Sequence, residues 1–335
     1  MMQRTFGRTG WRVGAVGFGA WAIGGSWGDV AESDAKGALH AALDAGVTLV
    51  DTADVYGDGR SERLIREVLE ERGVLHEAPG EGRPVVLTKA GRRLDPHVAE
   101  GYTAANLRAF VDRSRDLLGM PMLDLVQLHC PPAAVLYDPE AIAAMDALVA
   151  DGLVRHWGVS VEKVEEGLKA LEIPTVASVQ IIWNAFRQRP ADLFLPRALA
   201  KGVAVVARVP LASGLLAGKI TRETRFAPDD HRAYNRHGEA FDVGETFAGV
   251  PLDVALDAVE EVRRLLPLGT DMAAWALRWC LMDEAVSVVI PGAKDARQAR
   301  ANAAAGDLAP LPPQAMEAVR DLYRTRIAPH VHQRW

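Results

Sequence analysis

Short runs of β-branched and aliphatic residues alternate with longer, partly polar stretches along most of the chain. Each run is apolar at successive positions, which is typical of strands that are buried on both faces of a parallel sheet. Eight runs of this kind lie at residues 13–18, 47–50, 85–88, 123–128, 157–159, 176–179, 203–207 and 286–290. Eight buried strands with intervening helices predict an α/β protein with a closed (β/α)8 TIM barrel, and an open, doubly wound sheet is the alternative.

The stretches between these strands carry the residue types that begin and end helices. Residues 33–45, 61–72 and 103–118 each begin at Ser or Thr, and each is followed directly by Gly. A hydroxyl oxygen accepts hydrogen bonds from the unpaired amides of a first turn, and Gly adopts the left-handed conformation at which many helices end. We therefore expect helices over these three ranges.

Two segments depart from the alternation. Residues 3–6 and 11–13 flank a turn at 7–10, which predicts an N-terminal β-hairpin that closes the floor of the barrel. After the seventh predicted strand, residues 219–251 are polar and irregular, with Arg, Asp and Gly throughout. Long loops of this kind often have functional roles, so we expect 219–251 to be a cofactor or substrate loop. We see no linker-like tract and expect residues 1–335 to form a single domain.

Composition and charge narrow the classes of partner and location. The 335 residues are 49% apolar and 24% charged, with a formal net charge of −6 and no block of like charge. A nucleic acid or an anionic membrane is therefore a disfavoured partner. The chain lacks an apolar stretch of about 18 residues and a secretory signal, so we expect a cytoplasmic protein. Cys130 and Cys280 stand apart from any metal-ligand spacing, and we expect reduced thiols and no metal site.

Polar residues capable of proton transfer follow consecutive predicted strands. Asp51 and Tyr56 come after the second strand, Lys89 after the third and His129 after the fourth. The carboxyl ends of barrel strands meet at one rim, so these four side chains are expected to share one network. Considered singly, Asp51 has a plainer role as a helix cap, and the other three have plainer roles as rim or loop residues. Their joint placement favours catalysis.

The spacing of these four residues resembles the catalytic tetrad of the aldo-keto reductases. Further similarities to that family follow in the family's order, at residues 17–21, 44–57, 61–62, 123–129, 158–160, 179–180, 210–219 and 290–294, with Gln298 and Asn302 after them. The resemblance covers nearly the entire chain. It implies an oxidoreductase that transfers a hydride between a nicotinamide cofactor and a small-molecule carbonyl or alcohol, such as an aldehyde, a ketone or a sugar.

The chemistry of that reaction gives each member of the tetrad a role. Hydride transfer to a carbonyl builds negative charge on its oxygen, which requires a proton donor, and the resemblance assigns this role to Tyr56. Lys89 would lower the pKa of Tyr56, and Asp51 would keep Lys89 charged. His129, neutral or charged, would orient the substrate oxygen. In the oxidative direction Tyr56 would accept the proton of the alcohol.

The chain has no GxGxxG after a strand, so a Rossmann fold is not indicated. The expected cofactor site therefore depends on the resemblance to the family. Ser160 and Gln180 would hold the carboxamide, and residues 210–216 would surround the pyrophosphate. Lys294 and Arg297 lie near the expected 2′-phosphate, which favours NADP over NAD, although both would also suit an exposed helix start. The full expected set is Gly19, Asp51, Ser160, Gln180, Arg208, Pro210, Leu211, Gly214, Leu215, Gly292, Lys294, Gln298 and Asn302.

Two positions depart from the family pattern. Val161 follows Ser160 where the family commonly has Asn, and Arg208 stands where it usually has an aromatic residue that stacks on the nicotinamide. Arg208 could stack its guanidinium on that ring, or it could meet a phosphate or an acidic substrate. The expected substrate contacts are Trp21, Tyr56 and His129, and three more aromatic residues are expected on or near the mouth: Trp27, Trp183 and Tyr137.

Alternative functions remain open at this point. The same site could belong to an NAD-dependent sugar or alcohol dehydrogenase that runs oxidatively, or to a cofactor-binding regulatory subunit with slow turnover. A Schiff-base lyase with Lys89 as nucleophile is a third alternative, which Asp51 disfavours because a charge-paired lysine is a poor nucleophile. Both a monomer and a homo-oligomer are compatible with the sequence.

Overall fold

Eight parallel strands form the centre of the protein, and the computed structural model describes residues 1–25 and 30–335. The strands follow one another around the sheet in chain order, as β3 (Phe18–Gly19), β4 (Leu49–Asp51), β5 (Val85–Ala90), β6 (Leu123–His129), β7 (Val154–Ser160), β8 (Val176–Ile182), β9 (Ala204–Arg208) and β10 (Val286–Val289). Parallel bridges join Val16 to Val289 and Gly19 to Gly292, so the last strand lies beside the first and closes the sheet. The predicted (β/α)8 barrel is therefore confirmed.

The barrel strands are apolar at successive positions because they have a core on each face. Inside the barrel, alternate strand residues form one apolar cluster that includes Leu87, Leu125 and Val206. On the outer face, residues such as Val86 and Val126 pack against the helices in a larger cluster. Both sides of each strand thus exclude water, which removes the alternation of polar and apolar residues seen in half-exposed strands.

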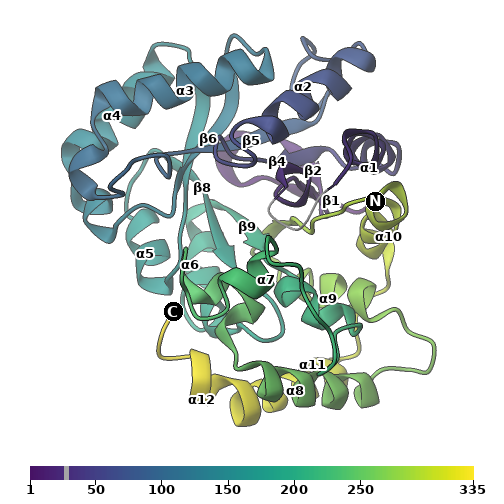
Figure 1. Cartoon of the computed structure of the whole chain (residues 1–335). Helices are drawn as coiled ribbons and strands as arrows, with labels where there is room; N and C mark the ends of the chain where they lie inside the picture. The colour runs from purple at the N-terminus through teal and green to yellow at the C-terminus, as the bar shows by residue number, and fades with distance from the viewer. Residues whose placement is uncertain (26–29) are drawn as a thin grey trace.

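Helices surround the strands (Figure 1). The described helices are α1 (Glu32–Asp44), α2 (Arg60–Glu71), α3 (Ala104–Leu118), α4 (Pro139–Ala150), α5 (Val164–Ala170), α6 (Phe194–Lys201), α7 (His231–Tyr234), α8 (Leu252–Leu265), α9 (Met272–Cys280), α10 (Ala296–Ala304), α11 (Pro313–Leu322) and α12 (Ala328–Val331). The three predicted helices are present as α1, α2 and α3. Thr103 caps α3 by accepting a hydrogen bond from the Asn106 amide, and Gly119 ends it at a φ of 65°.

The N-terminal hairpin is also present, but the predicted first strand at 13–18 is divided. Strand β1 (Gln3–Thr5) pairs antiparallel with β2 (Arg12–Gly14), so residues 13 and 14 belong to the hairpin, and the run joins the barrel only from Val16, with β3 at Phe18 and Gly19. Phe6 is fully buried in the inner apolar cluster, and a Cβ at Gly7 would lie 2.4 Å from the Ala204 amide. The hairpin therefore packs tightly against the floor of the barrel.

Residues 219–251 follow β9 and contain short ordered elements. Helix α7 lies here, as do two single turns at Val243–Glu245 and Phe247–Gly249, and α7 lies over the strands in Figure 1. The side-chain oxygen Oδ1 of Asn235 accepts hydrogen bonds from the backbone amides of Ala240 (2.8 Å) and Phe241 (2.9 Å). The indole nitrogen of Trp335 donates to Asp242 at 2.8 Å. This excursion is thus held by internal hydrogen bonds and by a hydrogen bond from the C-terminal Trp335.

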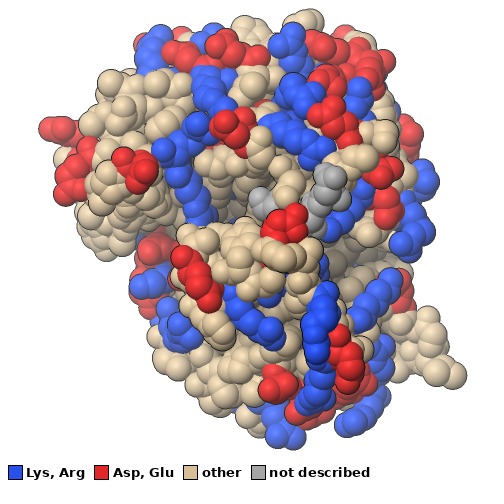
Figure 2. Space-filling view, viewed as in Figure 1, with Lys and Arg blue, Asp and Glu red and all other residues tan. Residues whose placement is uncertain are grey.

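Surface charge and helix length add two observations. Figure 2 shows Lys and Arg side chains interspersed with Asp and Glu across one face of the molecule. Within residues 1–25 and 30–335, every helix is too short or too polar to cross a membrane.

Candidate active site

A pocket of about 450 Å³ lies at the carboxyl ends of the barrel strands. Its lining includes Asp51, Tyr56 and His129 of the predicted tetrad, and the fourth member, Lys89, is buried directly behind them. Most of the expected cofactor set lines the same pocket: Gly19, Ser160, Gln180, Arg208, Pro210, Leu211, Gly214, Gly292, Lys294, Gln298 and Asn302. Segments from across the sequence thus meet at one rim, as the barrel topology requires.

Lys89 is the centre of a short hydrogen-bonded chain. Its ammonium group lies 2.7 Å from Asp51 Oδ2, 2.7 Å from the Thr52 carbonyl oxygen and 3.3 Å from Tyr56 Oη. Burial alone would lower the pKa of Lys89, but the charges and hydrogen bonds of Asp51 and Tyr56 outweigh it and raise that pKa overall. Lys89 is therefore a charged, fully engaged donor, which argues against a role as a Schiff-base nucleophile.

Tyr56 presents its hydroxyl to the pocket as a neutral phenol. Burial raises its pKa, and Lys89 opposes the rise, but the negative charges of Asp51 and Glu245 add to it. Lys89 lowers the pKa of Tyr56 by its charge and its hydrogen bond, as expected, but burial outweighs this contribution and the pKa is raised overall. The phenol stays protonated at neutral pH, and the adjacent ammonium is placed to stabilise a phenolate once the proton leaves.

His129 is a neutral imidazole beside Tyr56. Burial holds its pKa well below the ordinary value, and the positive charges of Arg92 and Lys89 lower it further. The two rings meet edge to face with centroids 6.0 Å apart. Among the residues that the structure describes, none is hydrogen-bonded to the buried His129 Nδ1. The sequence left both charge states open, and the structure favours the neutral one.

Gln180 is tied to the tetrad by its amide group. Its Nε2 donates to Asp51 Oδ1 at 2.7 Å and to Gln127 Oε1 at 2.9 Å, so Asp51 is held by Lys89 on one oxygen and by Gln180 on the other. Sequence reasoning did not single out Gln127. The signal was a buried amide in the apolar run of β6, where a polar residue requires a partner.

A second buried carboxyl lies in the loop that carries Tyr56. Asp54 is fully buried and does not line the pocket. Within the described residues, neither of its carboxyl oxygens has a hydrogen-bond partner. Burial and the charge of Glu62 raise the pKa of Asp54 to about 7. Asp54 therefore gains or loses its proton near neutral pH.

Arg208 is the centre of a second charged network. Its Nη2 donates to Glu162 Oε2 at 2.7 Å and to the Val161 carbonyl at 3.1 Å, and its Nη1 lies 3.6 Å from Glu245 Oε1. Arg92 Nη1 lies 3.2 Å from the same Glu245 oxygen. The two departures from the family pattern, at 161 and 208, therefore contact each other directly.

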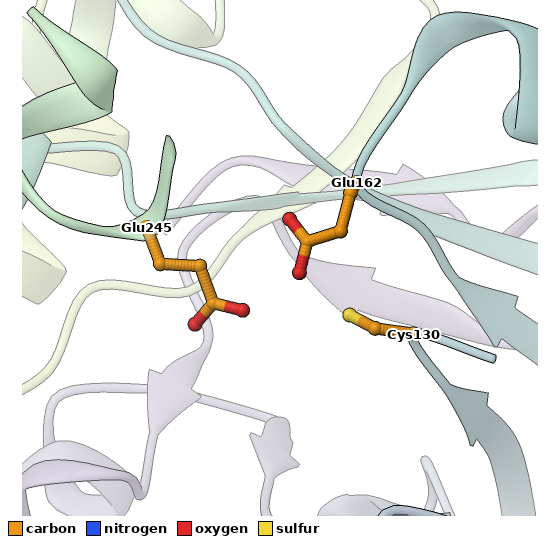
Figure 3. A group of neighbouring side chains, drawn as sticks. All are labelled: Cys130, Glu162 and Glu245. Atoms are coloured by element: carbon orange, nitrogen blue, oxygen red, sulfur yellow. The ribbon is translucent and has the colours of Figure 1, made fainter. Parts of the chain in front are cut away.

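The side chains around Arg208 include ligand types that metals also use. Figure 3 shows the carboxyl groups of Glu162 and Glu245 and the Cys130 thiol pointing toward one another, and their ligand atoms lie within 4.8 Å of each other. Arg208 contacts all three groups, with 3.8 Å to Cys130 Sγ, so a guanidinium supplies the positive charge here. Burial also raises the pKa of Cys130, which keeps it a thiol. Because two carboxyls offset the Arg208 charge, a role for Arg208 in holding a phosphate or an acidic substrate is disfavoured.

The aromatic residues expected around the mouth do not all lie there. Trp21 lines the pocket and stacks on Tyr56 with centroids 6.2 Å apart. Trp183 is instead buried between the barrel and α9, where it donates to the Cys280 carbonyl at 3.0 Å and packs on Trp279. Tyr137 is 67% exposed and contacts Lys169 outside the pocket. Trp27 lies outside the described residues.

One expected cofactor contact is also misplaced. Leu215 is buried in the outer apolar cluster and does not line the pocket, whereas Gly214 before it does. Gly214 has a φ of 93°, and this left-handed turn directs the chain so that the following apolar side chain packs inward. The excursion supplies three lining residues that the sequence did not single out: Lys219, Arg232 and Glu245.

Residues from 292–302 form another part of the pocket lining. Lys294 and Arg297 are among them. Gln298 Oε1 accepts a hydrogen bond from the Lys294 amide at 3.0 Å, and Asn302 Nδ2 donates to the Gly292 carbonyl at 3.1 Å. Gln298 and Asn302 thus fix the turn that presents Lys294 to the pocket.

The profile of the Aldo/keto reductase family matches residues 15–324. The chain belongs to this family of oxidoreductases. It is 29% identical over 299 residues to the aldo-keto reductase YhdN of Bacillus subtilis, with 88% of this chain and 85% of that protein covered. It is 28% identical over 327 residues to a probable voltage-gated potassium channel subunit beta of Oryza sativa, with 93% of each chain covered.

Solved structures of aldo-keto reductases share the fold. A glycerol dehydrogenase from Gluconobacter oxydans has a TM-score of 0.76 and 28% identity, and the match covers 98% of this chain and 96% of that chain. The holo form of an aldo-keto reductase from Bacillus halodurans has a TM-score of 0.75 and 24% identity, with 96% of each chain covered. The barrel and the order of its strands are thus those of the family.

Proposed function

We propose that this protein interconverts a small-molecule carbonyl compound and its alcohol with a nicotinamide cofactor, with Tyr56 as the acid and base. The observation that carries the proposal is the chain from Asp51 through Lys89 to Tyr56, with a Lys89–Asp51 distance of 2.7 Å and a Lys89–Tyr56 distance of 3.3 Å. This chain ends in the pocket beside a neutral His129. A proton donor backed by a fixed ammonium is what carbonyl reduction requires.

The residues that line the pocket fit a nicotinamide dinucleotide. Ser160 and Gln180 line the same pocket as Tyr56 and would hold the carboxamide, whereas Lys294 and Arg297 would meet phosphate groups. When bound, the cofactor supplies the hydride in reduction and accepts it in oxidation. Two cations at the end expected to hold the adenosine favour a 2′-phosphate, so we propose NADP as the preferred form.

The chain's own residues move the proton. Tyr56 Oη donates its proton to the substrate oxygen, and Lys89 stabilises the phenolate that remains. Asp51 keeps Lys89 charged in a site where burial alone would discharge it. Neutral His129 offers a ring nitrogen to the same substrate oxygen and fixes its orientation. In oxidation the phenolate of Tyr56 takes the alcohol proton back.

Two relatives support narrower alternatives. The similarity to a glycerol dehydrogenase favours an alcohol substrate and the oxidative direction. The similarity to plant proteins named as probable potassium channel beta subunits favours a regulatory subunit with slow turnover. The complete tetrad is compatible with either, and the turnover rate distinguishes them.

The test is a fluorescence titration with NADPH and NADH side by side, followed by turnover on a panel of small aldehydes and alcohols. We expect tighter binding of NADPH, and we expect Tyr56→Phe to lose turnover by about 10²–10⁴-fold while it retains cofactor binding. Tyr137→Phe is the matched control, because Tyr137 is exposed and lies outside the pocket. Failure of both nucleotides to bind, or full turnover in Tyr56→Phe, would contradict the proposal.

We further propose that residues 1–335 act as one unit and that residues 219–251 close over the cofactor. Support comes from Lys219, Arg232 and Glu245, which reach the pocket from this excursion. Limited proteolysis with and without NADPH tests the closure. Protection of 219–251 by the cofactor is expected, and cleavage at an unchanged rate would rule the closure out.

A further inference from the structure

The network around Arg208 lies at the reacting end of the pocket. Arg208 and Glu245 line the pocket together with Tyr56 and His129. Glu245 adds to the electrostatic field at Tyr56, and Arg208 adds to the field at His129. The net charge of this network therefore acts on a nicotinamide ring or a substrate carbonyl that binds between these side chains.

That net charge has two accessible values. Arg92 and Arg208 are both held ionised by the carboxyls beside them. Arg208 and Arg92 also outweigh the effect of burial on Glu245 and lower its pKa to about 2. Glu162 is different, because burial and the nearby Glu245 raise its pKa to about 7 although Arg208 opposes the rise. The four groups are neutral together when Glu162 is ionised, and they carry one positive charge when it is protonated.

Glu162 faces charged or titratable groups from every element packed around it. Arg208 approaches from the end of β9, Cys130 follows β6, and Arg92 follows β5. The excursion presents Glu245 and Asp242, which both disfavour the ionised form, and Arg187 after β8 favours it. Arg208 donates a 2.7 Å hydrogen bond to the Glu162 carboxyl, and the Glu245 carboxyl lies within 4.8 Å of it. Protonation of Glu162 thus changes the charge that Arg208 presents to the pocket.

A nicotinamide ring is positively charged when oxidised and neutral when reduced. An extra positive charge at the reacting end repels the oxidised ring and leaves the reduced ring nearly unaffected. We propose that Glu162 is a specificity-determining residue that makes the pocket's preference between oxidised and reduced nicotinamide cofactor depend on its own protonation, through Arg208 and Glu245. This inference rests on the proposed nicotinamide function.

The proton balance fixes the direction of the effect. Below about pH 7 the free protein carries the proton on Glu162, and binding of the oxidised cofactor releases it to solvent as the carboxyl ionises. Because one proton is released on binding, the affinity for the oxidised form falls by at most about tenfold for each pH unit below that point. Binding of the reduced form releases none, so its affinity stays nearly constant.

The experiment measures the dissociation constants of NADP⁺ and NADPH for the whole protein between pH 6 and pH 8. Their ratio is used because protonation of the 2′-phosphate affects both forms alike and cancels. We expect the ratio of the NADP⁺ constant to the NADPH constant to be about five- to tenfold larger at pH 6 than at pH 8. Glu162→Gln mimics the protonated carboxyl, so its ratio should be large and independent of pH.

Two further variants test whether the pH dependence of the ratio comes from Glu162. Glu245→Gln removes the like charge, so Glu162 should ionise throughout this range and the ratio should again be independent of pH. Glu172→Gln is the matched control, since Glu172 is exposed and pairs with Lys201, and it should keep the wild-type slope. A merely structural role for Glu162 would change both constants together and would leave the slope of the ratio in place.

The outcomes separate this inference from the proposed function. Binding of both forms with a ratio that does not vary with pH would overturn the inference alone. A wild-type slope in Glu162→Gln, with a melting temperature like that of the wild type, would also overturn it. If neither form binds, the proposed function falls and this inference falls with it.

Discussion

The pocket has two charged walls that differ in how their charges are balanced. On the wall formed by β4 and β5, Lys89 and Asp51 pair in a 2.7 Å contact, and Lys89 is completely buried. On the opposite wall, formed by β7, β9, the excursion and Arg92 after β5, two arginines face two carboxyls, and burial raises the pKa of Glu162 to about 7. The first wall holds one fixed ionisation state, whereas the second can store or release a proton. A barrel rim can thus combine a rigid acid–base site with an adjustable field.

The largest effect is expected from a substitution that removes the cation of the Lys89–Asp51 pair on the first wall. Lys89→Met should lower turnover by about 10²–10⁴-fold, because Tyr56 loses the cation that stabilises its phenolate. It should also lower the free energy of unfolding by about 3–5 kcal/mol, because Asp51 keeps a buried charge without its partner. Turnover assays and urea denaturation measure the two effects.

Lys201→Met is the matched control for this variant, because Lys201 is a surface residue paired with Glu172. It should change neither turnover nor stability by a measurable amount. If Lys89→Met were as stable as Lys201→Met, the Lys89–Asp51 pair would not have the structural role described here.

A smaller effect tests the buried carboxyl behind the rigid wall. Asp54 has a pKa raised to about 7, above that of an unfolded chain, so it stabilises the fold at low pH and this contribution is lost as pH rises from about 4 to 7. Asp54→Asn removes that loss. Relative to the wild type, the variant should therefore gain about 2–4 kcal/mol between pH 4 and pH 8 in denaturation experiments.

Asp58→Asn in the same loop provides a control of opposite sign. Asp58 is exposed, and the hydrogen bond and charge of Arg93 lower its pKa, so its contribution is present at high pH and lost as pH falls. The variant should show a weak change in the reverse direction. Identical pH profiles for the two variants would contradict the assignment of the effect to burial of Asp54.

The smallest of the three effects is expected from a substitution that removes Arg208 from the second wall. Arg208→Leu leaves Glu162 and Glu245 without a shared cation, but Arg92 still contacts Glu245 and Glu162 can take up a proton. We expect a loss of only about 1–2 kcal/mol of unfolding free energy, below that of Lys89→Met. A loss as large as that of Lys89→Met would show that the second wall is as rigid as the first.

The same contrast explains which features the sequence could predict. The strands of the barrel were predictable because each is buried on both faces and therefore apolar throughout. Asp51, Lys89 and His129 were predictable because each ends or directly follows such a run, where the topology alone places it at the rim. The division of the first run was not predictable, since residues 13–18 are apolar throughout and only the tertiary structure assigns residues 13–14 to the hairpin.

The sequence contains no comparable signal for the second wall. Glu162 and Glu245 lie far apart in sequence and meet only because the excursion folds back over the rim. Trp183 directly follows β8, and the sequence does not reveal that its ring turns outward to Trp279. Leu215 was misplaced for the same reason, because the left-handed turn at Gly214 determines its direction.

The closure of the barrel also bears on how a ligand stabilises it. Strand β3 has only two residues, and its neighbours across the closing edge are joined to it by the bridges Val16–Val289 and Gly19–Gly292. By contrast, β6 and β7 pair continuously along most of their length. Gly19 and Gly292 both line the pocket, so a molecule that contacts both spans the edge at which the sheet closes. Its binding energy therefore adds to the cohesion of the barrel at the edge where the sheet closes.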